Sequence, residues 1–113
     1  MFSGDRQYIV PQYKLILSYD IQPGSRERYY QYVMSELVPA LQEEGLYMTE
    51  AWHTAFGEYP IRLIIFAAED YDTIEMVLAS EKWQMMEDEF QRFIRNYTKL
   101  VVPYRQGFQF ITG

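Results

Sequence analysis

The sequence predicts a single α+β domain with a ferredoxin-like β-α-β-β-α-β plait, and three observations lead to this fold class. The spacing of apolar residues changes from two to about four and back again along the chain. A short break flanked by two strand-like segments places a hairpin in the middle. A length of 113 residues, of which 49% are hydrophobic, fits one domain with its own core. An antiparallel four-stranded sheet with both helices on one face satisfies this order.

The first half of the chain predicts a strand followed by a long helix. Residues 13–21 alternate in the manner of a strand, and Gln22-Pro23-Gly24 breaks it. Ser25 is placed to cap a helix over 26–44, which Pro39 should kink or split and Gly45 should end. The apolar positions that alternate on the strand are Tyr13, Leu15, Leu17, Tyr19 and Ile21.

The second half predicts a hairpin, a broken helix and a final strand. Strands are expected over 46–56 and 61–68, joined by a turn over 57–60. Asp72, with Glu75 three residues later, resembles a capping box. Ser80 offers a second cap, so the helix should resume over 81–97, and the last strand should follow over 100–111. We interpret residues 1–11 as an N-terminal arm and 12–113 as the domain.

One face of the predicted sheet has no helix to cover it, and this predicts a homodimer. Four strands of ~20 Å at about 4.8 Å spacing present roughly 400 Å² of sheet, the size of a large apolar patch on a monomer. If the more apolar set of the first strand faces the helices, the open face carries the other side chains. On this interpretation the open-face residues are Lys14, Ile16, Ser18, Asp20, Thr49, Ala51, His53, Arg62, Ile64 and Phe66.

Charge and composition exclude several classes of protein. A net charge of −6 and a pI near 4.7 disfavour nucleic acid and anionic membranes as partners. The chain has no cysteine, which excludes disulfides and thiolate chemistry and fits a cytoplasmic protein. One histidine among scattered carboxylates gives no metal-ligand spacing, and no helix offers a haem ligand. We therefore expect no metal and no cofactor.

Several short motifs together resemble a known family. They are Ile21-Gln22-Pro23-Gly24, the helix end at 41–45, Ala51-Trp52-His53 before Gly57, Glu69-Asp70-Tyr71-Asp72 and Ser80-Glu81-Lys82-Trp83. With the order of elements, they resemble the dimeric α/β barrel superfamily over residues 12–112, and within it the NIPSNAP-like branch. The resemblance implies homodimers joined sheet to sheet with a pocket between the sheets. It also implies functions that range from cofactor-free monooxygenases to small-molecule sensors.

The candidate site residues lie on the predicted open face. His53, the only histidine, is the candidate general base, and its alternative role is a structural hydrogen bond. Ser18 and Asp20 could form a hydrolase triad with His53, but they stand about 7 Å apart on one strand, without the sharp turn that exposes a nucleophilic serine.

Positive side chains suggest an anionic ligand for the same face. Lys14, Arg62 and Arg105 would bind a carboxylate, or else form salt bridges to Asp20 or Glu50 of a partner subunit. Phe66 adds an apolar wall. Across the hairpin, His53 and Arg62 should lie almost opposite each other.

Two hypotheses about function stay open at this point. The first is a homodimeric small-molecule-binding domain with an inter-sheet pocket, in its enzymatic form a cofactor-independent monooxygenase or isomerase. The second is a non-catalytic sensor or assembly module of the same fold. A proton-transfer group in the pocket would separate them, and only His53 qualifies.

Overall fold

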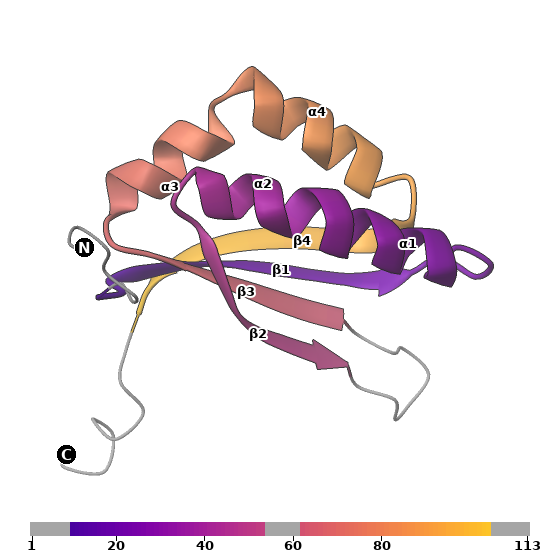
Figure 1. Ribbon diagram of the computed structural model, residues 1–113. Helices are drawn as coiled ribbons and strands as arrows, with labels where there is room; N and C mark the ends of the chain where they lie inside the picture. Colours follow the sequence, from indigo (N-terminus) through magenta and orange to yellow (C-terminus); the bar gives the residue numbers. More distant parts are fainter. Residues whose placement is uncertain (1–9, 54–61, 105–113) are drawn as a thin grey trace, which may run out of the picture.

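The computed structural model describes residues 10–53 and 62–104 and has the predicted α+β architecture. Four antiparallel strands form one sheet in the order β2-β3-β1-β4. The helices all lie on one face of this sheet (Figure 1). The elements are β1 (Tyr13–Ile21), α1 (Arg26–Tyr32), η1 (Val33–Leu37), α2 (Val38–Glu43), β2 (Tyr47–His53), β3 (Arg62–Ala68), α3 (Tyr71–Leu78), α4 (Glu81–Phe90) and β4 (Ile94–Pro103).

The core lies between the sheet and the helical layer. Leu15, Leu17 and Tyr19 of β1 are buried, which confirms the predicted helix-facing set of this strand. Trp83 and Phe90 of α4 pack into this core from the helical layer. Because the apolar residues of β1 repeat every second position, only one face of the strand is able to enter this core.

The predicted faces of the hairpin are wrong for Ala51, His53, Arg62, Ile64 and Phe66. Leu17 pairs with Ile64 and Leu15 with Phe66, and paired residues of an antiparallel sheet share a face. Ile64 and Phe66 therefore point into the core, where both are almost fully buried. The same register puts Arg62 beside Tyr19 on the helix side. His53 and Ala51 of β2 follow their partners Arg62 and Ile64 to that side.

The first helical region changes its hydrogen-bond pattern without ending. A π-helical turn, η1, stands between α1 and α2 and ends two residues before Pro39. Proline has no N–H to donate to the helical hydrogen-bond pattern. Near it the backbone adopts π-helical hydrogen bonds between residues five apart, such as the bond from the N–H of Val38 to the carbonyl of Val33. Gly45 ends the region with a φ of 96°, as predicted.

Two predicted boundaries in the second helical region are wrong. The cap of α3 is Asp70, which accepts a hydrogen bond from the N–H of Thr73, and not Asp72. Ser80 caps α4 as predicted, but α4 ends at Phe90 and β4 already begins at Ile94. Phe93 and Ile94 are buried although they lie beyond the end of the helix. Phe93 stands in the turn after α4 and Ile94 begins β4, so their apolar spacing does not indicate a helix.

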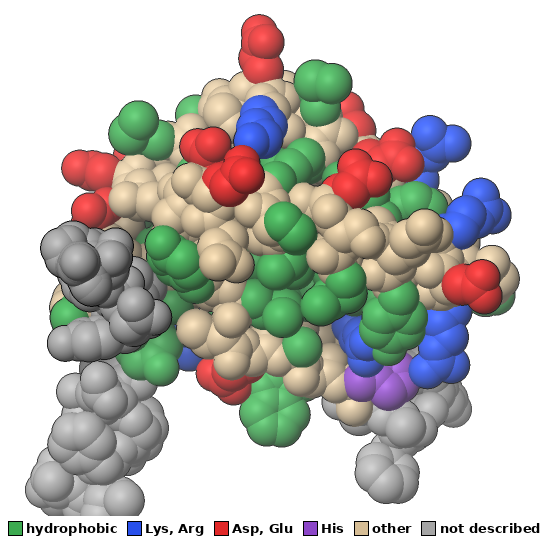
Figure 2. Space-filling model, in the orientation of Figure 1, with side chains coloured by type: hydrophobic (Ala, Val, Ile, Leu, Met, Phe, Trp, Pro, Cys, Tyr) green, Lys and Arg blue, Asp and Glu red, His purple; other side chains and the backbone are tan. Residues whose placement is uncertain are grey.

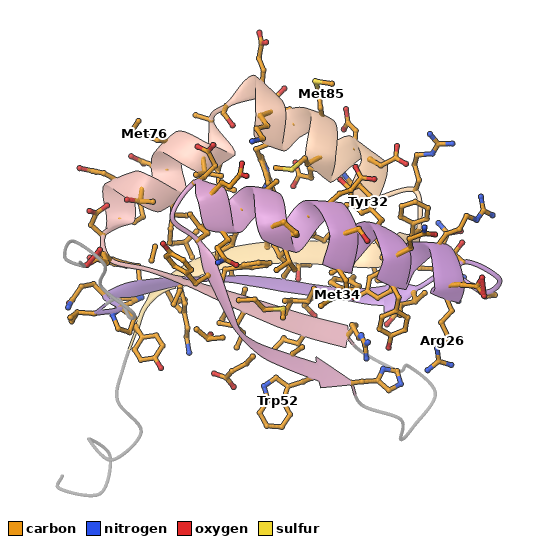
Figure 3. All side chains as sticks on the ribbon, in the orientation of Figure 1. Arg26, Tyr32, Met34, Trp52, Met76 and Met85 are labelled. Carbon is orange, nitrogen blue, oxygen red and sulfur yellow. The ribbon has the colours of Figure 1, made fainter. Side chains whose placement is uncertain are left out.

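The open face of the sheet is apolar at its centre and aromatic at one edge. Ile16 of β1 pairs with Ile65 on one side and Leu100 on the other. Leu100 and Trp52 are 57% and 59% exposed, and Trp52 points away from the helices (Figure 3). No helix within residues 10–53 and 62–104 is long and apolar enough to cross a membrane.

Candidate functional site

A pocket of about 380 Å³ lies at the end of the sheet where α1 begins. Four elements meet there: the end of β1 with the turn after it, the start of α1, the end of β2 and the start of β3. The lining residues are Ile21, Gln22, Pro23, Gly24, Arg26, His53 and Arg62. Arg26 extends from the start of α1 toward this end of the sheet (Figure 3). The space-filling view shows blue side chains on both sides of the purple histidine at this end (Figure 2).

The turn between β1 and α1 is held in place by its backbone and by Gln22. Gly24 adopts a φ of 83°, a left-handed conformation that glycine tolerates best, and the N–H of Ser25 donates to the carbonyl of Gln22 at 3.0 Å. The side-chain amide of Gln22 donates to the carbonyl of Ile94 at 3.0 Å. The turn is thus fastened to β4, which gives the pocket a rigid wall.

His53 and Arg62 stand opposite each other at the open end of the β2–β3 pair. This confirms the pairing predicted from the hairpin. It places an imidazole and a guanidinium in the wall of one pocket, on the helix side of the sheet and not on the open face. The imidazole of His53 and the guanidinium of Arg62 reach the surface at this end of the sheet, because the helical layer does not cover them there.

Arg62 is held by tyrosines. Its Nη2 donates a hydrogen bond to the hydroxyl of Tyr30. The guanidinium carbon lies 4.8 Å from the ring centroid of Tyr30 and 5.8 Å from that of Tyr29, which are cation–π distances. Behind them the hydroxyl of Tyr29 is hydrogen-bonded to that of Tyr19. Burial raises the pKa of both Tyr19 and Tyr29 above the usual range, so these phenols are neutral at physiological pH.

The pocket carries positive charge that no described carboxylate neutralises. The ion pairs within residues 10–53 and 62–104 join Lys82 to Glu44, Arg92 to Glu89 and Lys99 to Glu87. Neither Arg26 nor Arg62 takes part in them. In a chain of net charge −6, two such arginines in one pocket favour an anionic ligand. No group of three His, Asp or Glu side chains in the same described ranges is placed to hold a metal ion.

The other predicted site residues that the structure describes lie away from this pocket. The Nζ of Lys14, at the far end of β1, lies over the ring of Tyr104 at 5.5 Å from its centroid. Ser18 faces the open side, and Asp20 accepts a 2.7 Å hydrogen bond from the side chain of Asn96. Phe66 is in the core. Arg105 lies outside the described residues, so its place in the site stays a prediction.

Sequence reasoning missed the residues that complete the pocket. Arg26 and Gln22 flank the predicted Pro-Gly turn, and a turn that leads into a helix signals a place where side chains converge. Tyr30 gave no such signal, because it sits in the apolar period of a helix and looks like a core residue. Its contact with Arg62 depends on the tertiary fold alone.

Solved structures with this fold come from several bacteria. An uncharacterised NIPSNAP-domain protein from Burkholderia xenovorans is 14% identical, with a TM-score of 0.63 over 85% of this chain and 96% of that one. A NIPSNAP family protein from Agrobacterium tumefaciens is also 14% identical, with a TM-score of 0.62 over 86% and 95%. SnoaB, a cofactor-independent oxygenase from Streptomyces nogalater, is 10% identical, with a TM-score of 0.63 over 86% and 96%.

Comparison at the level of sequence gives no match. No protein-family model and no curated protein sequence matches the chain. The similarity is therefore one of architecture, carried by the order of strands and helices over most of the chain. The chain has the ferredoxin-like fold of the NIPSNAP-domain proteins and of SnoaB, which confirms the resemblance that the sequence motifs predicted.

Proposed function

We propose that the chain is a homodimeric small-molecule-binding domain whose pocket at Arg26, His53 and Arg62 takes a small organic anion. The observation that carries this proposal is the absence of a carboxylate partner for either arginine among the described residues. The guanidinium of Arg62 is partly desolvated, and an anionic ligand in the pocket would supply it with a counter-ion.

The chemistry of the lining narrows the ligand class. A guanidinium presents several donors in one plane and binds carboxylates or enolates through two parallel hydrogen bonds. Ile21 and Pro23 offer apolar surface beside these donors. A volume of about 380 Å³ lies at the small end of the range for ligand pockets. An aromatic or short-chain carboxylic acid satisfies all three conditions.

A pair of matched arginine variants tests the proposal. Benzoate is the probe, and benzamide is its uncharged control. By titration calorimetry, Arg26→Gln should weaken benzoate binding about tenfold or more, because a charged hydrogen bond contributes roughly 1.5–3 kcal/mol. Arg28→Gln, two residues along the same helix and outside the pocket, should leave it unchanged. Equal affinities in both variants and in the wild type would remove the proposal.

The enzymatic form of this function uses His53 as a general base. His53 would take a proton from a carbon acid while Arg62 holds the resulting enolate. The shared fold with SnoaB supports this form. Deuterium exchange into acetylacetone, followed by NMR, separates it from a non-catalytic sensor or assembly module. Exchange that is faster than buffer and is lost in folded His53→Ala favours the enzyme, whereas binding without exchange favours the sensor.

Loss of folding in His53→Ala would point to the structural alternative. If His53→Ala unfolds while Arg62→Ala neither unfolds nor loses benzoate binding, His53 only supports the end of β2, and the base hypothesis should be dropped.

The dimer is supported by the open face of the sheet. Ile16 and Leu100 form an apolar centre there beside the buried Ile65, and Trp52 is exposed at the β2 edge. Exposed apolar side chains on one face of a sheet mark an interaction site. A second copy of the chain, related by a twofold axis, would cover this face with the same residues.

A further inference from the structure

The strongest unexplained feature of the pocket is that Arg62, the more buried of its two arginines, is held by the phenol of Tyr30. Arg62 contacts a cluster of tyrosines at the edge of the core, made of Tyr19, Tyr29 and Tyr30. An arginine this close to a core is usually tied by a carboxylate, which cancels its charge. Here the hydrogen-bond acceptor is the hydroxyl of Tyr30.

Tyr30 is itself fixed by packing against the core. Its ring meets that of Tyr29 edge to face, with centroids 5.1 Å apart and planes at 70°. Tyr29 is 2% exposed, and its ring lies 5.7 Å from that of Tyr19. Phe90 stands 4.9 Å behind Tyr19 at 87°. These rings pack closely in the interior and hold Tyr30 in place, and Tyr30 in turn holds the guanidinium of Arg62.

We propose that Tyr30 is a positioning residue that sets the anion affinity of the pocket, because it holds the Arg62 guanidinium in place without neutralising it. This inference rests on the proposed function. The hydroxyl of Tyr30 takes up one guanidinium N–H, and the hydroxyl of Tyr29 also hydrogen-bonds to the guanidinium. Because neither phenol is charged, the remaining donors and the full positive charge are left for the ligand. A carboxylate at the same place would compete with the ligand, and the empty space left by a smaller residue would let the guanidinium swing into water.

Tyr30→Phe is the direct test, since it removes one oxygen and keeps the ring. Titration with benzoate should give a Kd about tenfold higher than in the wild type, which corresponds to about 1.4 kcal/mol. Benzamide, which needs no positive charge, should bind equally well to both. Tyr71→Phe, at the start of α3 and remote from the pocket, is the matched control and should change neither Kd.

Arg62→Lys tests the same inference without altering Tyr30. Lysine keeps the charge but has no planar fork to lie against the Tyr30 ring, so benzoate affinity should fall at least as far as in Tyr30→Phe. This variant decides the matter if Tyr30→Phe fails to fold. Wild-type benzoate affinity in Arg62→Lys would show that orientation is immaterial and would overturn the positioning role.

The failure of this inference is distinguishable from failure of the proposed function. If Arg62→Gln leaves benzoate binding unchanged, the pocket is not the anion site and both proposals fall. If Arg62→Gln weakens binding while Tyr30→Phe binds benzoate like the wild type, the site stands and only the positioning role is overturned. Equal losses for benzoate and benzamide in Tyr30→Phe would mean a general structural role, which also overturns it.

Discussion

Leu17 and Ser18 are neighbours on β1 whose environments differ completely. Leu17 is fully buried between the sheet and the helices, while Ser18 lies on the open face. Leu17→Ala should lower the free energy of unfolding by about 2–5 kcal/mol, because a cavity replaces packed methyl groups. Ser18→Ala should cost far less. Urea denaturation of both variants checks this, and equal costs would mean that β1 does not have the face assignment described.

Arg62 shows where residue-level prediction reached its limit. Alternation assigned β1 correctly because its two faces differ in polarity. The β3 sequence, Arg62-Leu63-Ile64-Ile65-Phe66-Ala67-Ala68, is apolar on both faces, so the period does not choose between them. A charged first residue appeared to belong to the open side. The tyrosine rings that accommodate Arg62 on the inner side, Tyr29 and Tyr30, come from α1, and the sequence of β3 gives no sign of them.

At the scale of elements, the long apolar pattern after Ser80 predicts one helix, although the segment contains a helix, a turn and the start of a strand. Phe90, Phe93 and Ile94 are all buried, so their spacing resembles a helical face. The N–H of Phe93 donates to the carbonyl of Phe90, which closes a tight turn, and Ile94 pairs with Ile21 of β1. Long-range pairing with β1 decided this boundary, and no local signal carries that information.

The proposed dimer depends on the open face of the sheet. Leu100→Glu places a charge at the apolar centre of this face and should convert a dimer into a monomer. Met76→Glu, at a more exposed position on the helical layer, should leave the dimer intact (Figure 3). Light scattering should give about twice the 13.6 kDa chain mass for the wild type and Met76→Glu. A folded wild-type monomer that persists at micromolar concentration would contradict the dimer.

At the scale of the whole molecule, the buried tyrosines predict a loss of stability in alkali. Burial raises the pKa of Tyr32 to about 12, and burial also raises the pKa values of Tyr19, Tyr29 and Tyr97. The folded state therefore keeps phenol protons that the unfolded chain releases near pH 10. Stability is fully present below about pH 10 and falls as the pH rises through about 12.

Urea denaturation at increasing pH measures this effect. The urea midpoint should be lower at about pH 11 than at about pH 9, and tyrosinate absorbance should rise together with unfolding. Tyr32→Phe removes one of the shifted groups and should make the dependence shallower. A midpoint that stays constant up to about pH 11 would show that these phenols do not resist ionisation in the folded state.

The fold class followed from the order of periodic segments, whereas the site did not. Its two chemical groups, His53 and Arg62, were paired correctly through the hairpin but placed on the opposite face. Arg26 joins them only because the β1–α1 turn folds back toward the end of β3. Electrostatics at this scale depends on where the few arginines of an acidic chain gather, which composition alone does not specify.

The central claim, an anion site at Arg26, His53 and Arg62, is tested most directly by mapping benzoate on the wild-type protein with amide NMR shifts. We expect saturable shifts for the amides of Gln22, Gly24, Arg26 and His53, and little change at Lys14 or Val102 at the other end of the sheet. Benzamide should leave the same amides unshifted. Saturable shifts confined to the open sheet face, or none at all, would contradict the claim.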